Sequence, residues 1–271
     1  MLLSLGISLG LSRKPGHSII LEMGALFKIL SCSLLRLVVV CAAMAAVFLA
    51  EVVAQGNQCI NLEEISQKKV RKYILRKNID KMQDFSSIHP SFTKDEKETG
   101  LKVNEKIFYL RSRLASVWNG YREANPAEAF NSRSFRLEMM IMKKSNDVYY
   151  KNAMSLPVID TGQLYFFDIR LMKGLVNVPM AFEVINIDDT KKVLEVSYIE
   201  GNKAQGKQQV QFFDNGDGRT MVVHKSFFKS HSWLRDTFLY PYFHRRLVRD
   251  YHRTMEKLVQ EKSSSLISLA E

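Results

Sequence analysis

Residues 192–228 read KVLEVSYIEGNKAQGKQQVQFFDNGDGRTMVVHKSFF, three strand-like runs with no helix between them. In the first run, Leu194, Val196 and Tyr198 alternate with polar residues, as in a strand with one buried face. The next two runs flank the loop from Asp214 to Gly218, whose Asn-Gly and Asp-Gly pairs indicate a hairpin. Strands joined by short turns pair antiparallel, because a parallel pair needs a long crossover. This stretch therefore predicts an antiparallel meander.

The same pattern begins further upstream, and a single long amphipathic helix follows it. The expected strands are 135–143 (extended by Tyr149 and Tyr150), 163–172, 179–187, 192–200, 207–213 and 219–228. The closing helix is expected to begin near Pro241, since proline suits a first helical turn and not a helix interior. We expect an α+β fold in which an antiparallel sheet of about six to seven strands wraps around this helix. The space between sheet and helix could then hold a ligand.

The residues before the strands predict an accessory helix and a second, amphipathic helix. Asn61 and the acidic residues after it favour a helix over 62–81 with a basic surface. Residues 82–103 lack periodicity and read as a linker. From Asn104 to Asn125, apolar residues recur at helical spacing. The expected units are 55–103 (N-terminal helix and linker), 104–262 (main domain) and 263–271 (flexible, serine-rich tail).

Residues 1–54 have the pattern of an export signal whose true start is Met23. A basic stretch precedes an apolar run that ends at Glu51, and small residues up to Ala54 form a cleavage site. The run is shorter than the ~20 residues needed to cross a bilayer. We expect a secreted or periplasmic protein, the alternative being a membrane anchor through residues 37–54.

The order of elements resembles the START-like helix-grip superfamily, which includes lipid-transfer domains, polyketide cyclases and plant hormone receptors. The resemblance covers about residues 104–261 and is to an uncharacterised branch of the superfamily. It is carried by Val117-Trp118, by Gly206-Lys-Gln-Gln-Val-Gln and by the stretch from Lys229 to Pro241. The resemblance implies a cavity between sheet and final helix that takes a hydrophobic or amphipathic ligand. The family's first strand is not evident here: either residues near Ser91-Phe92 supply it or the sheet is one strand short.

The sequence contains no motif for a metal, a nucleophile or a phosphate, and we expect neither a metal nor a cofactor. His244 and His252 are eight residues apart, roughly 12 Å along a helix, which is too far for one metal ion. His224, Asp168 and Glu183 are titratable residues within apolar strands. Each would face either solvent, on the wet side of the sheet, or the cavity, where it could serve as acid or base.

Adjacent aromatic residues at Phe166-Phe167 and Phe212-Phe213 make both faces of the sheet apolar, because neighbouring strand residues point to opposite sides. The outer face must therefore be covered by helix 62–81, by a partner or by a membrane.

The net charge of +11 favours anionic partners or serves solubility. A cationic stripe that leads into the closing helix and along it contains Arg235, Arg245, Arg246, Arg249 and Arg253. Because no aromatic residues interleave with it to stack bases, we expect no nucleic-acid partner. The stripe is either a solvated face or a contact with an anionic membrane surface.

Together these features predict an exported, non-enzymatic binding or carrier protein for a hydrophobic or amphipathic small molecule such as a lipid. The expected ligand contacts are His224 and Asp168, as orienting polar groups, and Tyr198, Leu247, Tyr251 and Met255. One alternative is a cyclase- or hydrolase-like enzyme with His224 or a strand carboxylate as general base. The other is an envelope protein-interaction module. A cavity with two hydrogen-bonded titratable groups, one with a displaced pKa, would favour the enzyme; a filled interior would favour the module.

Overall fold

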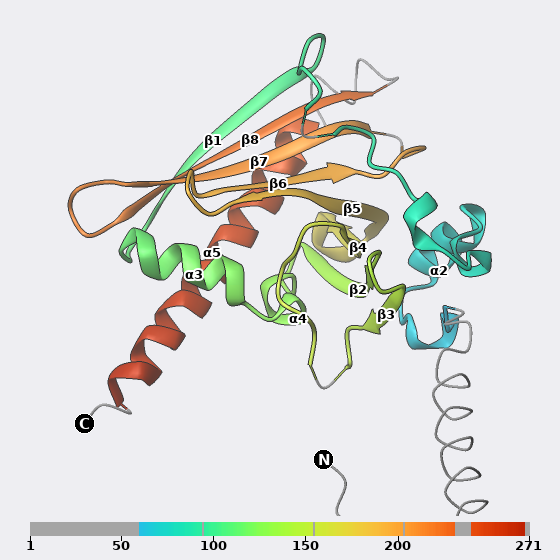
Figure 1. Cartoon of the computed structure of the whole chain (residues 1–271), viewed down its shortest axis with the longest axis horizontal. Coiled ribbons are helices and arrows are strands. Elements are labelled where there is room, and N and C mark those ends of the chain that lie inside the picture. The colour runs from blue at the N-terminus through green and yellow to red at the C-terminus, as the bar shows by residue number, and fades with distance from the viewer. Residues whose placement is uncertain (1–59, 94, 154, 203, 231–239, 269–271) are drawn as a thin grey trace, which may run out of the picture. The chain divides into compact units, whose positions relative to one another are not determined.

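A twisted antiparallel sheet packs one face against a long helix in the computed structural model, which describes residues 60–93, 95–153, 155–202, 204–230 and 240–268 (Figure 1). The eight strands lie in the order β1-β8-β7-β6-β5-β4-β2-β3. Their bounds are β1 Lys102–Leu110, β2 Phe135–Met142, β3 Asp147–Tyr150, β4 Gln163–Leu171, β5 Val176–Asp188, β6 Val193–Tyr198, β7 Ala204–Asp214 and β8 Thr220–Ser230. The helices are α2 Lys68–Arg76, α3 Leu114–Glu123, α4 Pro126–Ala129 and α5 Tyr240–Ser268. The predicted α+β helix-grip fold is confirmed, with eight strands in place of about six to seven. The export signal lies outside the described residues.

Strands β4 to β8 form the predicted meander, in which each strand pairs antiparallel with the next. The hairpin expected at the Asp214–Gly218 loop joins β7 and β8, with Asp214 opposite Thr220. Strand β5 begins at Val176, three residues before the predicted start at Pro179. The short turns leave these strands no other partner, and the sequence therefore determines their order.

The predicted helix from Asn104 is wrong in its first half. Lys102–Leu110 form strand β1, which pairs with β8, and helix α3 begins only at Leu114. β1 thus supplies a strand before helix α3, so this strand is not formed near Ser91-Phe92 and the sheet is not one strand short. β1 is an edge strand whose two faces both carry apolar residues, among them exposed Ile107 and buried Leu110. The strand therefore lacks the apolar and polar alternation that identifies a strand in the sequence. Ile107 also lies three residues before Leu110, and Leu110 four residues before Leu114, which is the spacing typical of a helix.

Helix α5 crosses the inner face of the sheet and packs closely against α3 (Figure 1). A Cβ atom at Gly120 would lie 2.4 Å from Cγ2 of Val259, so only glycine allows this approach of the two helices. α5 extends from Tyr240, next to the predicted start at Pro241, to Ser268. Residues 263–268, predicted as a tail, therefore belong to the helix.

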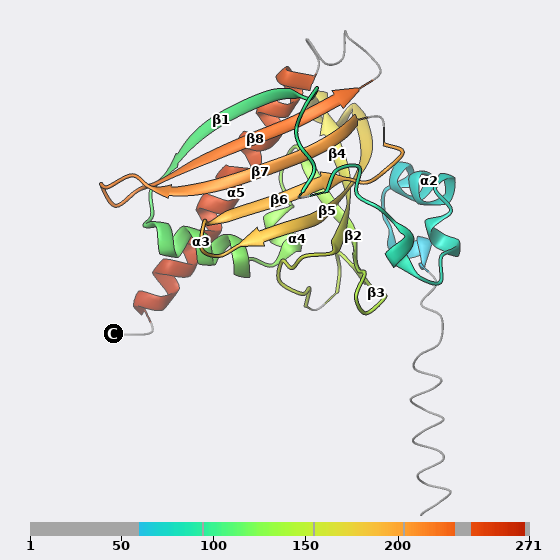
Figure 2. The same cartoon turned by 45° about the horizontal axis from the view of Figure 1, so that its top comes forward.

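The N-terminal segment covers the outer face of β2, β4 and β5, which confirms the first of the three proposed coverings at Phe166 (Figure 2). At the other predicted position it is wrong, because Phe213 on β7 is 37% exposed. Val70, Tyr73 and Ile74 of α2 pack there against Phe166 and other outward residues. The segment is not one helix over 62–81. It consists of α2 between two 3-10 turns, Leu62–Glu64 and Ile79–Lys81. The helix ends before Asn78, whose φ of 53° is left-handed.

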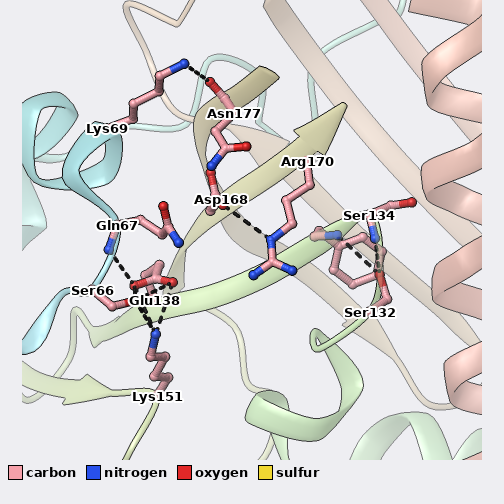
Figure 3. Close-up of polar contacts among 11 residues, drawn as sticks. Ser66, Gln67, Lys69, Ser132, Ser134, Glu138, Lys151, Asp168, Arg170 and Asn177 are labelled. Atoms are coloured by element: carbon pink, nitrogen blue, oxygen red, sulfur yellow. Dashed lines mark hydrogen bonds and ion pairs between the residues drawn. The ribbon is translucent and has the colours of Figure 1, made fainter. Parts of the chain in front are cut away.

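A buried carboxylate fastens this segment to the sheet (Figure 3). Glu138 is fully buried on β2 and accepts hydrogen bonds from the Ser66 hydroxyl at 2.8 Å and from the Gln67 backbone N–H at 3.2 Å. Lys151 supplies the balancing charge, with its ammonium 3.2 Å from the same carboxylate. Because Ser66 and Gln67 face Glu138 instead of continuing a helix, α2 begins only at Lys68.

Candidate functional site

A cavity of about 770 Å³ lies between the inner face of the sheet and helix α5. Strands β4 to β8 form its floor, and the first part of α5 forms its roof. The lining is mainly apolar and aromatic, and includes Phe130, Tyr165, Phe167, Phe182, Val196, Phe243 and Leu247. The space predicted between sheet and helix is therefore present, and the interior is not filled by side chains.

Aromatic contacts fix the wall beneath α5. The rings of Phe130 and Tyr251 stack with centroids 5.4 Å apart and an interplanar angle of 8°. Phe130 also meets Phe167 edge to face at 5.0 Å. Burial raises the pKa of Tyr165 and of Tyr251, so both hydroxyls stay protonated at neutral pH. The wall is apolar, aromatic and uncharged.

A chain of polar side chains runs from α3 through α5 to the cavity floor, where it ends on β6. The Tyr121 hydroxyl lies 2.7 Å from Nδ1 of His252, and Nε2 of His252 lies 3.0 Å from Nδ1 of His224. Nε2 of His224 lies 2.9 Å from Oε1 of Gln208, whose Nε2 lies 3.3 Å from the Tyr198 hydroxyl. His224, Gln208 and Tyr198 all line the cavity.

With both imidazoles neutral, as their lowered pKa values require near pH 7, the chain has one self-consistent arrangement of protons. Because Oε1 of Gln208 only accepts, Nε2 of His224 must carry a proton, and its Nδ1 is then an acceptor. His252 therefore donates from Nε2 and accepts the Tyr121 hydroxyl proton at Nδ1. Both imidazoles are neutral in this arrangement. Burial lowers the pKa of His252 to about 3, and burial with the neighbouring His252 and His244 lowers the pKa of His224 well below its usual range.

A third histidine lies beside this chain. Nε2 of His244 is 2.9 Å from the Ser226 hydroxyl, and its ring centroid is 5.8 Å from that of His224. Burial, with a smaller effect of Lys106, lowers the pKa of His244 to about 4. Three neutral imidazoles thus gather where the inner face of β8 meets α5.

These histidines make the folded protein sensitive to acid. A histidine whose pKa is lowered by folding takes up its proton on unfolding, so its stabilising contribution is complete above the unfolded pKa of about 6.5. That contribution is lost as the pH falls towards the folded values of about 4 for His244 and about 3 for His252. We expect a loss of about 2 kcal/mol per histidine between pH ~6.5 and ~5.

Thermal unfolding followed across that pH range tests this expectation. His244→Gln removes one titrating group and retains a donor for Ser226, so its melting temperature should fall less steeply with acidification. A melting temperature that is constant over the range, or equal slopes for the two proteins, would contradict it.

The structure brings four of the six predicted contact residues to the cavity. His224, Tyr198, Leu247 and Tyr251 line it. Met255 does not: it is fully buried one turn further along α5, where it packs in the core with α3. Met255 does lie on the buried, apolar face of the helix, as predicted. At this turn of α5, however, side chains of the sheet and of α3 pack directly against the helix and leave no cavity.

Asp168 lies on the other face of the sheet and cannot orient a ligand in the cavity. Its neighbours in the strand, Phe167 and Ile169, line the cavity, so its side chain points outward under the N-terminal segment. It is fully buried, 3.6 Å from Nε of Arg170, and burial raises its pKa (Figure 3). Glu183 also lies outside the cavity lining and pairs with Lys143 at 3.0 Å.

Sequence reasoning missed His252, His244 and Gln208 as parts of the site. The separation of His244 and His252 along the helix excludes a shared metal ion, and the sequence suggested no other role for them. Each instead meets a different inward residue of β8, Ser226 or His224. The available signal was their position on the apolar face of the closing helix, together with Val248 and Met255.

One border of the cavity is polar and basic. Tyr73, Arg76 and Lys77 at the end of α2 and Asn202 after β6 belong to the lining. The Tyr73 hydroxyl donates to Oδ1 of Asn202 at 2.5 Å, and the Lys77 ammonium donates to the Glu200 carbonyl. The accessory helix thus contributes to the site as well as covering the sheet.

No group of three side chains that could hold a metal ion occurs among the described residues. Within the same residues, no helix combines the length and apolarity needed to span a bilayer.

No protein-family model matches the chain, and no curated protein matches it. Solved structures are similar at low identity. A point mutant of norcoclaurine synthase from Thalictrum flavum is 14% identical with a TM-score of 0.45, over 62% of this chain and 99% of that one. An aromatase/cyclase from a Streptomyces species is 10% identical with a TM-score of 0.41, over 62% and 96%. A START superfamily protein from Mycobacterium smegmatis is 8% identical with a TM-score of 0.42, over 60% and 99%. At these values the similarity says nothing about ligand or reaction.

Proposed function

We propose that this protein binds one hydrophobic or amphipathic small molecule, such as a lipid, in the cavity between the sheet and α5, and carries it without chemical change. The observation that supports this proposal is the volume of about 770 Å³ with mainly apolar and aromatic walls. Ligand sites typically enclose about 300–1,000 Å³ and have such walls. A guest that buries ~300 Å² of apolar surface would gain ~7 kcal/mol before the costs of ordering.

The polar groups of the cavity suit an amphipathic guest. Gln208, His224 and Tyr198 form a short uncharged strip on the floor, and Arg76 and Lys77 lie at one border. A ligand with an apolar body and one polar end would bury the body against the walls and place the polar end at either position. A charged group is disfavoured at the strip, because the buried histidines are neutral.

We also propose that the mature protein acts outside the cytoplasm. The support is the signal pattern of residues 1–54. N-terminal sequencing of the protein from its own host should find Gln55 as the first residue. Retention of residues 37–54 in a membrane fraction would favour the anchored alternative.

One observation favours the enzyme as a second candidate: two hydrogen-bonded histidines, one of them lining the cavity, have displaced pKa values. However, Nδ1 of His224 accepts from His252 and its Nε2 donates to Gln208, so neither nitrogen is available as a base in this arrangement. An enzyme would return its ligand chemically altered, and His224→Asn would stop turnover while binding persists. A carrier returns the ligand unchanged.

Titration with an environment-sensitive fluorescent long-chain amphiphile tests the proposal. We expect saturable binding of one probe per protein, and displacement by long-chain but not by short-chain competitors. Binding without saturation, or displacement that is independent of chain length, would contradict it.

A further inference from the structure

The turn between β4 and β5 exposes apolar side chains at a protruding tip. Met172 is 56% exposed, Leu175 83% and Val176 40%, and Leu175 is the most exposed large apolar side chain among the described residues. Soluble proteins commonly expose single apolar side chains, but three in one short turn are a patch that needs an explanation. We call residues 172–176 the β4–β5 tip.

The backbone of this tip is held in an unfavourable conformation. Met172, Lys173 and Gly174 have φ angles of 50°, 61° and 94°, all in the left-handed region. Glycine adopts that region freely, whereas methionine and lysine are disfavoured there. The chain therefore makes this turn at a conformational cost, and Leu175 then points into solvent. Such strain is typically retained at functional positions.

The tip adjoins the cavity. Leu171 before it and Val178 and Pro179 after it belong to the cavity lining. The end of α2, with Arg76 and Lys77, contributes to the same lining. The Lys69 ammonium donates to the backbone carbonyl of Asn177 at 3.0 Å, and this contact ties α2 to the start of β5 (Figure 3). The exposed apolar tip and the end of the basic helix therefore both adjoin the same part of the cavity lining.

The charge around the tip is positive. Lys173 lies within it, and Lys69, Lys72 and Arg76 lie on neighbouring α2. Among the described residues, no ion pair with a carboxylate involves any of these four. Apolar side chains flanked by lysine and arginine are the composition that binds the interface of an anionic bilayer.

We propose that the β4–β5 tip and the basic end of α2 form a docking surface for an anionic lipid bilayer. Leu175, Met172 and Val176 enter the headgroup region, while Lys173 and the α2 cations contact lipid phosphates. Docking brings this border of the cavity to the membrane, so that an amphiphile passes between bilayer and cavity without crossing water. This role for the border rests on the proposed binding function, but docking itself does not.

Co-sedimentation with vesicles tests the docking surface. The full protein should bind vesicles that contain phosphatidylglycerol more tightly than vesicles of phosphatidylcholine alone, and added salt should weaken the binding. Leu175→Asp should reduce binding by about tenfold or more, because a charge at the tip opposes insertion. Val158→Asp is the matched control, since Val158 is 52% exposed in another loop, and should bind like the original protein.

A charge reversal gives a second, independent comparison. Lys173→Glu should weaken binding to anionic vesicles, whereas Lys191→Glu, a highly exposed lysine in the β5–β6 turn, should not. Absence of vesicle binding by the full protein, or equal losses in tip and control variants, would overturn the docking surface. Leu175→Asp should still bind the soluble fluorescent amphiphile. If neither the original protein nor any variant binds the amphiphile but the original protein still binds vesicles, the carrier function is wrong and the docking surface is retained.

Discussion

Gly206→Ala is expected to prevent β7 from pairing with β8 and to destabilise the protein by more than about 4 kcal/mol, an exceptionally large loss for one methyl group. Gly206 has a φ of +128°, and an added Cβ would lie 1.9 Å from the carbonyl oxygen of Phe227. The same atom would lie 2.9 Å from Cα of Phe228. Since both contacts are with backbone, no side-chain rotation can relieve them.

The hydrogen bonds of Gly206 increase the damage. Its N–H donates to the Ser91 hydroxyl at 3.1 Å, and its carbonyl accepts from the Ser197 hydroxyl at 3.1 Å. Moving β7 away from β8 would also strain these bonds, which connect β7 with β6 and with the segment before β1. Because natural domains are stable by only about 5–15 kcal/mol, we expect little folded protein.

Gly216→Ala is the matched control. Gly216 also has a left-handed φ, of +80°, but an added Cβ would have no atom within 4 Å. Its cost is then conformational only, about 1 kcal/mol. Urea unfolding of both variants, or the soluble yield where Gly206→Ala cannot be purified, measures the difference. Similar losses at the two positions would mean that the close approach at Gly206 is unimportant.

Val196→Trp is expected to lower affinity for the fluorescent amphiphile by about 100-fold or more, because the indole would occupy the space of the ligand. Val196 lies in the middle of the cavity floor, between Val184 on β5 and Gln208 on β7, all three in the cavity lining. The protein should remain folded, because the added ring fills existing space and does not overpack a closed core.

Val223→Trp controls for the size of the new side chain. Val223 lies on β8 between the inward residues Val222 and His224, so it points to the opposite face, where it is half-buried. Its affinity for the amphiphile should equal that of the original protein. Equal affinities of both tryptophan variants would place the ligand outside the cavity.

Most of the strands could be predicted, because the features that produce them, turn residues and apolar alternation, lie within or next to each strand. Turn residues such as those of the Asp214–Gly218 loop fix neighbouring strands, and alternation identifies the buried face. β1 could not be recognised, because its partner β8 lies more than 100 residues further along the chain. The start of α2 depends equally on distant contacts, since Ser66 and Gln67 turn towards Glu138.

The candidate site could be predicted in part. Alternation shows that Phe167 and Asp168 point to opposite faces of the sheet. It does not show which of the two faces lines the cavity, and the assignment of Asp168 to the cavity face was wrong. Its burial depends on the covering N-terminal segment, which a single strand cannot reveal. His224 was identified because it interrupts an apolar strand. Its partner His252 could not be, because their 3.0 Å contact depends on how α5 lies across β8.

Native mass spectrometry of the protein purified from its own host tests whether the cavity holds a guest. The account predicts an added mass that corresponds to one hydrophobic or amphipathic molecule per chain, which organic extraction releases unchanged and which Val196→Trp does not retain. A chain that carries no added mass, and that also fails to take up any long-chain amphiphile offered to it, would contradict the account.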